Sequence, residues 1–177
     1  LIGKGFKELQ KVWKGLKHQE NIKSFLFSFF CYSAGVQTVL FLASTFAEKE
    51  LDFGTSELIS IVLLLQVVAI GGAYLFAKIS EWKGNKVSLI IMLLIWMVIC
   101  VVAYLVHSQA QFYGVAATVG FVMGGIQSLS RSTYSKLLPV GTQDTTSYFS
   151  FYDVLEKLAI VLGTFIFGYL DYLTGSM

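Results

Sequence analysis

Four runs of residues without a single Asp, Glu, Lys or Arg set the tightest limit on how this chain can fold. They cover residues 24–47, 58–77, 87–106 and 112–129, and apolar side chains dominate each of them. The hydrocarbon core of a bilayer is about 30 Å thick, and an α-helix crosses it in about 20 residues. Each run therefore predicts a helix that spans a membrane.

A fifth span is predicted over residues 148–172, although its charge-free part, residues 158–170, is too short to cross a bilayer alone. The segment begins with aromatic and apolar residues and then carries Asp153, Glu156 and Lys157. Ionisable side chains are expensive inside a bilayer, so a functional site is the default hypothesis where a span contains them.

The composition agrees with a membrane protein and argues against a soluble domain. Charged residues make up only 14% of the chain and hydrophobic residues 55%, whereas about a quarter of the residues of a soluble domain are charged. The basic residues form no stripe interleaved with exposed aromatics, so nucleic-acid binding has no support. Cys31 and Cys100 lie deep inside apolar runs. We therefore expect neither a disulfide framework nor a metal site, and no cofactor.

The sequence thus predicts an all-α, polytopic membrane protein with five transmembrane helices. We expect a cytoplasmic, basic amphipathic linker helix over residues 1–21 and a transmembrane helix bundle over residues 22–177. The spans of this bundle are expected at about residues 22–47, 57–79, 86–106, 111–130 and 148–172.

The linker helix is predicted from apolar residues that recur at helical spacing over residues 3–17, with lysines between them. The apolar residues are Phe6, Leu9, Val12, Trp13 and Leu16, and the lysines are Lys4, Lys7, Lys11, Lys14 and Lys17. Three interpretations stay open. The helix lies in the headgroup interface next to anionic lipid, packs as a linker against a partner domain, or simply connects to the first span in solvent.

The positions of the lysines and arginines predict the orientation. Basic residues gather before the first span and in the turns after the second and fourth spans, while only Lys49 lies on the other side. Positive residues favour the cytoplasm, so we expect residues 48–57 and 107–111 outside. The chain starts at Leu1 and ends outside at Met177 after an odd number of spans, so we expect a fragment that lacks spans at both ends. The basic groups are Lys4, Lys7, Lys11, Lys14, Lys17 and Lys23, then Lys78, Lys83 and Lys86, then Arg131 and Lys136.

Polar side chains and glycines give the spans different characters. Ser33, Gln37 and Ser44 share one helical face of the first span, and Gln66 is the only strongly polar residue of the second span ahead of a Gly-Gly pair. A polar stripe at this depth requires a neighbouring helix or a water-filled cavity. The third span is apolar almost all round and is predicted to face lipid.

In the fourth span, Gly120 and Gly124 form a small-xxx-small pair, which lets two helices approach closely. We expect these glycines to serve helix packing, with substrate contact as the alternative.

The turn between the second and third spans resembles the signature turn of the major facilitator superfamily. Its sequence is KISEWKGNK, residues 78–86. In that family, a glycine, an acidic residue, a second glycine and basic residues link two helices of a repeat. The resemblance implies that Glu81 takes the acidic position, Gly84 the tight turn and Lys86 a basic position. Trp82 stands where the family usually has Arg or Lys.

A narrower resemblance rests on GGIQSLSRSTYSKLLP, residues 124–139, followed by SFYDVLEKLAIVLGTFIFG, residues 150–168. Together they resemble the vacuole-effluxer-like branch of the superfamily, which contains uncharacterised bacterial permeases and fungal relatives linked to amino-acid efflux from the vacuole. The resemblance covers most of the chain. It implies helices 7 to 11 of a twelve-helix transporter, with an N-terminal six-helix half as partner and the final helix missing. It also implies a bacterial inner (cytoplasmic) membrane as the location.

The resemblance further implies a cytoplasmic gate at the ends of the helices. Arg131 ends the fourth span, where a cation suits the helix C-terminus, so an ordinary positive-inside anchor is the alternative to a gate ion pair. The gate candidates are Gly72, Glu81, Gly84, Lys86, Gln127 and Arg131.

The charges of the fifth span allow two interpretations. Asp153 and Lys157 are four residues apart and share a helical face, and Lys157 lies about 12 Å along the helix from an entry near Phe149. In the first interpretation they form a self-neutralised pair with snorkelling ends. In the second, Lys157 binds a substrate carboxylate, and Asp153 or Glu156 binds a substrate amine or a coupling proton. The candidates for substrate or proton coupling are Asp153, Glu156, Lys157, Gln37, Gln66 and Ser33.

We therefore expect a secondary active transporter that moves a small solute, with amino acids as one candidate, as two halves rock about a midplane site. The alternative is a non-transporting membrane scaffold or receptor with the same fold. An enzyme is not expected, because His18 and His107 are predicted on opposite sides of the bilayer and no GxSxG motif occurs. A channel is disfavoured, because no re-entrant, filter-like loop interrupts the spans. The substrate, the direction of transport and the coupling ion stay open.

Overall fold

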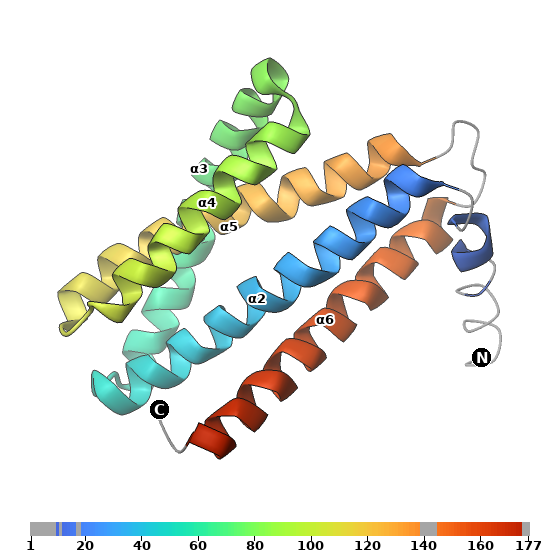
Figure 1. Ribbon diagram of the computed structural model, residues 1–177. Helices are drawn as coiled ribbons and strands as arrows, with labels where there is room; N and C mark the ends of the chain where they lie inside the picture. The colour runs from blue at the N-terminus through green and yellow to red at the C-terminus, as the bar shows by residue number, and fades with distance from the viewer. Residues whose placement is uncertain (1–9, 11, 17–18, 139–144, 175–177) are drawn as a thin grey trace. The chain divides into compact units, whose positions relative to one another are not determined.

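A computed structural model of the chain describes residues 10, 12–16, 19–138 and 145–174. Long α-helices dominate it, a short helical stretch covers residues 12–16, and no strand occurs in this described part. Figure 1 shows the long helices, which are α2 (Glu20–Glu50), α3 (Thr55–Lys83), α4 (Asn85–Tyr104), α5 (Gln109–Leu137) and α6 (Thr145–Thr174).

The helices confirm the all-α, polytopic prediction. By length and composition alone, α2, α3, α4 and α5 could each cross a membrane. Inside a bilayer only a helix or a closed barrel satisfies its own backbone groups, and charge-free runs of this length therefore fold as continuous helices. Helix α4 ends at Tyr104, where Leu105 N–H donates to Val102 C=O at 2.9 Å, and the bounds of the third predicted span, residues 86–106, stay a prediction. Helix α6 has 30 residues but is not among these four, so its crossing stays a prediction.

The chain groups into two compact units, one formed by Leu1–Phe41 with Lys136–Met177 and the other by Leu42–Ser135. The boundary falls inside α2, which contributes residues to both. Each unit is described by itself below.

In the unit Leu42–Ser135, α3 and α5 cross with their backbones in close contact. A Cβ atom added at Gly72 would overlap the carbonyl oxygen of Phe121, and one at Gly120 would come within 2.7 Å of the carbonyl oxygen of Leu65. A Cβ atom at Gly124 would likewise overlap the carbonyl oxygen of Ala69. Packing at small residues replaces the hydrophobic effect as the force between helices in lipid. The prediction that Gly120 and Gly124 serve packing is confirmed.

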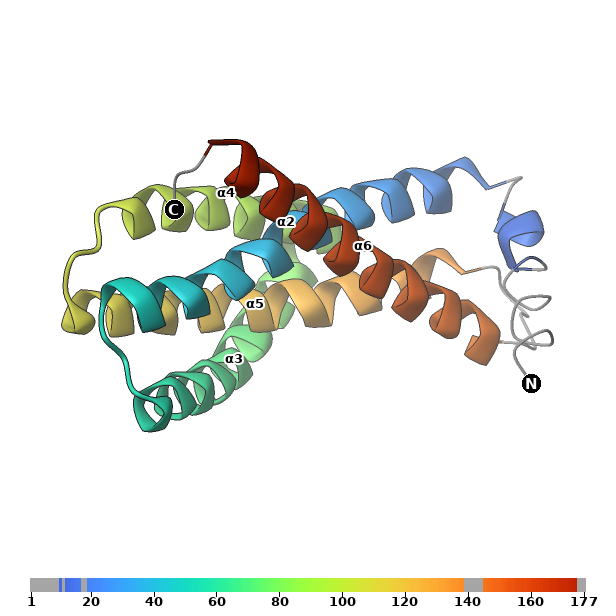
Figure 2. The same cartoon turned by 90° about the horizontal axis from the view of Figure 1, so that it is seen from below.

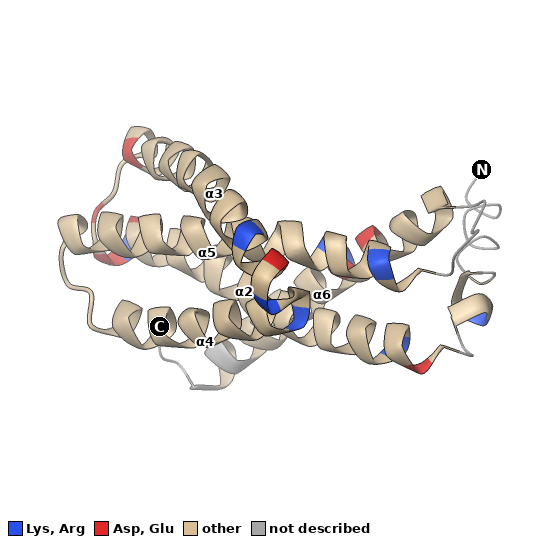
Figure 3. Cartoon of the chain, turned by 90° about the horizontal axis from the view of Figure 1, so that it is seen from above, with Lys and Arg blue, Asp and Glu red and all other residues tan. Residues whose placement is uncertain are grey.

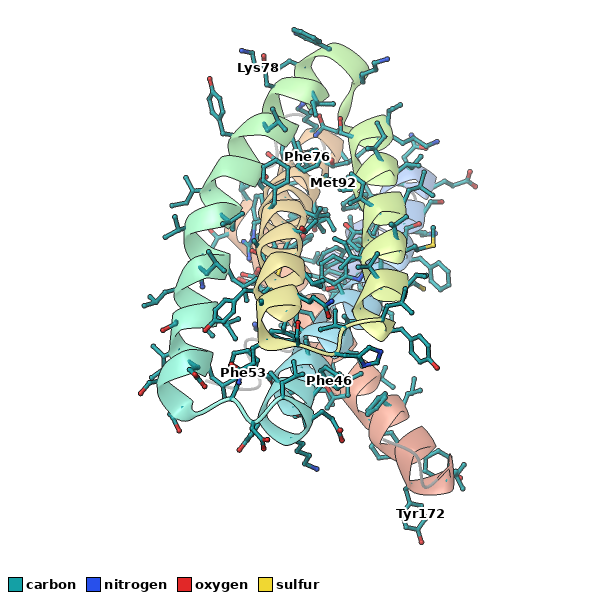
Figure 4. The ribbon with its side chains drawn as sticks, turned by 90° about the vertical axis from the view of Figure 1, so that its left-hand side faces the viewer. Phe46, Phe53, Phe76, Lys78, Met92 and Tyr172 are labelled. Atoms are coloured by element: carbon teal, nitrogen blue, oxygen red, sulfur yellow. The ribbon has the colours of Figure 1, made fainter. Side chains whose placement is uncertain are left out.

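Helix α4 packs on the same unit through Met92, which is fully buried. A Cβ atom added at Gly125 of α5 would meet the sulfur of Met92 and the ring of Phe76 from α3, both at 2.5 Å. Figure 4 shows Phe76 and Met92 in the interior between the three helices. The opposite face of α4 exposes large apolar side chains such as Val98 and Val101, as expected of a helix that faces lipid.

The other end of this unit is closed by an aromatic cluster around the loop after α2. Phe53 is 4% exposed, and its ring centroid lies 5.4 Å from that of Phe112 and 5.6 Å from that of Tyr113. Gln109 Nε2 donates to the carbonyl of Leu51 at 2.8 Å and ties the loop to the start of α5. Phe53 and Phe46 lie at the end of the unit opposite to Lys78 (Figure 4).

In the unit formed by Leu1–Phe41 and Lys136–Met177, α2 and α6 lie side by side and run in the same direction (Figures 1 and 2). Near their starts, the rings of Phe29 and Tyr152 stack with centroids 4.2 Å apart. Further along, a Cβ atom at Gly163 would overlap Thr38 Oγ1 and come within 2.7 Å of the carbonyl oxygen of Ala34. An aromatic stack and a glycine contact thus fix α6 against α2 at two levels.

Part of the predicted linker helix packs on the same unit. Val12 and Leu16 are 3% and 1% exposed, and the ring centroid of Trp13 lies 6.0 Å from that of Phe151 at the start of α6. The described part of the linker therefore packs against its own chain. The remaining residues of the prediction, Phe6, Leu9, Lys4, Lys7, Lys11 and Lys17, lie outside the described residues, as does His18.

Two neighbouring glycines of α3 give a direct test of the helix crossing. Replacement Gly72→Ala forces a methyl group into the backbone of α5, and overpacking of this kind typically costs about 1–3 kcal/mol. We expect a lower midpoint of thermal unfolding for the purified protein in detergent.

Gly71→Ala is the matched control, because a Cβ atom at Gly71 meets nothing within 4 Å. It should leave the midpoint unchanged or raise it slightly, since alanine favours a helix by about 0.5–1 kcal/mol over glycine. Equal effects of the two replacements would contradict the crossing.

Candidate functional site

The strongest candidate site is the charged turn of α6. Asp153, Lys157 and three apolar neighbours, Val154, Leu158 and Val161, line an open groove of about 290 Å³ on one face of the helix. All of these lining residues belong to α6. The surface of this groove is apolar, so Asp153 and Lys157 border it with the aliphatic parts of their side chains.

The charged turn is held in place by the residue just before it. Tyr152 is 2% exposed and Phe29 is 3% exposed, so their stack is buried. The side chain of Tyr152 points to α2, and the next residue in the chain, Asp153, is turned by about 100° around the helix axis. Packing of Tyr152 thus directs Asp153 and Lys157 to the groove.

The prediction that Asp153 and Lys157 share a face is confirmed, since both line the groove. Asp153 and Glu156 are half-buried, while Lys157 is exposed. Among the described residues, Lys157 has neither a hydrogen bond nor an ion pair. Whether Asp153 and Lys157 form a self-neutralised pair or bind a solute therefore stays a prediction.

Two polar residues of α2 belong to the same unit. Ser33 is 5% exposed and follows Phe29 by one turn on the buried face of α2, while Gln37 is half-buried one turn later. Because the two helices run in the same direction from the stack of Phe29 on Tyr152, Ser33 comes to a level near the charged turn of α6. Both residues stay candidates for solute contact.

The other candidates fall in the unit Leu42–Ser135. Gln66 and Gln127 are exposed, and Arg131 is exposed near the end of α5. Gly72, which the sequence grouped with the cytoplasmic turn, packs in mid-helix against the backbone of Phe121. The structure thus shows Gly72 in helix packing, and its role in a gate stays a prediction.

The signature turn has the backbone that its sequence predicts. Gly84 has φ +83° and separates α3 from α4, a conformation that glycine adopts without strain. Its N–H donates to the Ser80 carbonyl at 2.9 Å. Glu81 and Lys86 are exposed, and neither has a hydrogen bond or ion pair within the described part of the chain. Their gate role stays untested.

Sequence reasoning missed the polar residues that connect this turn to α5. Ser80 Oγ donates to Asn85 Oδ1 at 2.6 Å, and Asn85 Nδ2 donates to Thr133 Oγ1 at 3.0 Å. Asn85 occupies a position of KISEWKGNK that the resemblance left without a role. The only hint was that asparagine often bonds to nearby backbone or side chains at turns.

No group of three or more His, Cys, Asp or Glu residues that could hold a metal ion occurs in the part of the chain that the structure describes. The ionisable residues of the unit Leu42–Ser135 gather at its two ends, with acidic residues from the end of α2 to the start of α3 and basic residues around the turn after α3 (Figure 3). Such a distribution is typical of a protein that crosses a bilayer.

Comparisons with known proteins identify a family and several relatives. The family model "Vacuole effluxer Atg22 like" matches residues 1–177. The chain is 30% identical over 176 residues to "Uncharacterized MFS-type transporter YxiO" of Bacillus subtilis. It is 25% identical over 175 residues to "Autophagy-related protein 22" of Pichia angusta and 27% identical over 174 residues to the protein of the same name from Yarrowia lipolytica.

The chain spans less than half the length of these relatives. The alignments cover 99% of this chain but 40% of the Bacillus protein, and 93% of this chain but 31% of the Pichia protein and 29% of the Yarrowia protein. No solved structure matches the chain.

The stack of Phe29 on Tyr152 gives a test of how the site is held. Phe29→Ala should destabilise the protein by about 3–5 kcal/mol, the usual cost of removing a buried phenylalanine ring. The measurement is the midpoint of unfolding in a denaturant series in detergent. Phe27→Ala is the control, because Phe27 is 72% exposed two residues earlier on the same helix. If both variants unfold at the same midpoint, the stack does not hold α6.

Proposed function

Because the chain belongs to the vacuole effluxer Atg22-like family of the major facilitator superfamily, we propose that it is part of a secondary active transporter that moves a small solute by alternating access. It is a multi-pass membrane protein by its helices and its relatives. The observation that carries the proposal is the charged turn of α6, where an exposed Lys157 and a half-buried Asp153 line one groove.

The chain forms helices 7 to 11 of a twelve-helix transporter in this proposal. An N-terminal six-helix half is its partner, and the two halves rock about a site near the midplane. The coverage of 40% of the Bacillus relative supports a missing half. A bacterial cytoplasmic membrane is the proposed location, with residues 1–21 in the cytoplasm, because lysines dominate that segment.

The charged residues that border the groove suit a solute with both a negative and a positive group. The Lys157 ammonium group binds the carboxylate of the solute, and the carboxylate of Asp153 or Glu156 binds its amine or carries a coupling proton. The apolar residues Val154 and Leu158 bound the same groove. Amino acids combine these groups in one small molecule, and we propose them as the substrate class.

The transporter proposal is tested by flux into proteoliposomes that contain the protein together with its N-terminal half. A mixed amino-acid panel is offered with and without a pH gradient, in both directions. Flux of any panel member that depends on the gradient supports a proton-coupled transporter. A well-folded protein that moves no panel member in either direction would favour a scaffold or receptor role.

Lys157→Met tests the role of the ammonium group. Loss of a hydrogen bond to a charged partner costs about 1.5–3 kcal/mol, so we expect kcat/KM for flux to fall by at least about tenfold. Lys49→Met, in the last turn of α2, is the control and should transport normally. Unchanged flux and unchanged proton coupling in Lys157→Met would contradict the assignment.

A further inference from the structure

A directed chain of hydrogen bonds runs across one end of the unit Leu42–Ser135. Ser80 Oγ donates to Asn85 Oδ1 at 2.6 Å, Asn85 Nδ2 donates to Thr133 Oγ1 at 3.0 Å, and Thr133 Oγ1 donates to the carbonyl of Leu129 at 2.6 Å. Ser132 Oγ also lies 3.4 Å from Asn85 Nδ2. The chain connects the last turn of α3, the first residue of α4 and the last turns of α5.

Among the residues of this hydrogen-bonded series, only Asn85 bonds to both of the other helices. Its amide oxygen accepts from α3 while its amide nitrogen donates to α5, so the two ends of one small side chain serve two helices. Gly84, with φ +83°, turns the backbone so that Asn85 starts α4 next to Ser80. Ser80 is 8% exposed, which shields its bond from water.

Bonds that run donor to acceptor in one direction polarise one another, so such a chain is stiffer than separate contacts. The signature turn itself contributes little to this rigidity, because Glu81 and Lys86 have no polar partner among the described residues. The described hydrogen bonds between this turn and α5 therefore run through Asn85.

We propose that Asn85 is a positioning residue that makes the turn between α3 and α4 and the end of α5 move as one body during the transport cycle. The expected effect on transport rests on the proposed transporter function, whereas the attachment of the turn to α5 does not. When the two halves rock, a turn that is attached to α5 transmits the motion of the whole unit. A detached turn lags behind and slows the conversion between states.

Ser88 offers a matched control on the same face of α4. It lies one turn after Asn85 and is fully buried, and its Oγ has no hydrogen-bond partner among the described residues. Ser88→Ala therefore removes a buried polar group without removing a bond that joins helices, and it should leave the attachment of α5 intact.

The first experiment measures the attachment without any transport. Spin labels are placed at the exposed positions Lys78 and Ser135 of the protein with its N-terminal half, in a background without cysteines, and their distance is measured in nanodiscs. We expect one narrow distance distribution in the parent and in Ser88→Ala, and a broad one in Asn85→Ala. A narrow distribution in Asn85→Ala, in a protein that stays folded, would overturn the proposal.

Thr133→Val tests the bond from Asn85 to α5 separately from the bond between Asn85 and α3. It removes the hydroxyl that accepts from Asn85 and should broaden the distribution like Asn85→Ala. In the double variant the second replacement should add little, because both remove the same bond. If the two replacements broaden the distribution additively, the two residues act independently, and the proposed series of hydrogen bonds is contradicted.

The transport readout distinguishes a positioning role from a merely structural one. Per folded molecule, we expect kcat for flux to fall about twofold to tenfold in Asn85→Ala, the range for one lost hydrogen bond, with KM unchanged. A structural role would lower the amount of folded protein and leave kcat per folded molecule at the parent value. If the parent transports nothing, the transporter proposal fails, while the distance measurement still decides the role of Asn85.

Discussion

The close approach of the α3 and α5 backbones is the contact on which the unit Leu42–Ser135 depends. Lipid tails are as apolar as leucine, so two helices gain little from apolar side chains alone and need direct backbone packing. Gly72, Gly120 and Gly124 allow this backbone packing. Gly125 leaves room beside α5 for the side chains of Met92 from α4 and Phe76 from α3. This crossing holds the helices in the middle, and the bridge through Asn85 holds them at one end.

In the other unit, the same kind of packing holds the charged turn of α6 in place. The contact of Gly163 with Ala34 and Thr38 and the stack of Phe29 on Tyr152 fix α6 against α2. The charged turn follows directly after Tyr152, so this packing sets the direction in which Asp153 and Lys157 point. Retention of ionisable residues at such a position is typical of transport pathways.

The helices and much of the packing could be predicted from the sequence, because local rules decide them. Charge-free runs of bilayer length leave the backbone no alternative to a helix, and glycines at small-xxx-small spacing indicated the crossing at Gly120 and Gly124. The contributions of Gly72 and Asn85 were missed, since each depends on a partner more than 40 residues away in the sequence. The spacing of Asp153 and Lys157 predicted that they share a helical face. It could not predict whether they form an ion pair, because pairing depends on side-chain rotamers and on neighbouring residues.

The central claim is that the charged turn of α6 faces water inside the membrane. The most direct measurement is labelling of Lys157→Cys with a membrane-impermeant, hydrophilic maleimide in intact proteoliposomes that contain the protein with its N-terminal half. Val98→Cys is the reference, because Val98 is 62% exposed on a face of α4 expected to contact lipid, where a thiol does not ionise. The account predicts rapid labelling at position 157 and none at position 98. Absence of labelling at both positions would contradict an aqueous pathway at α6.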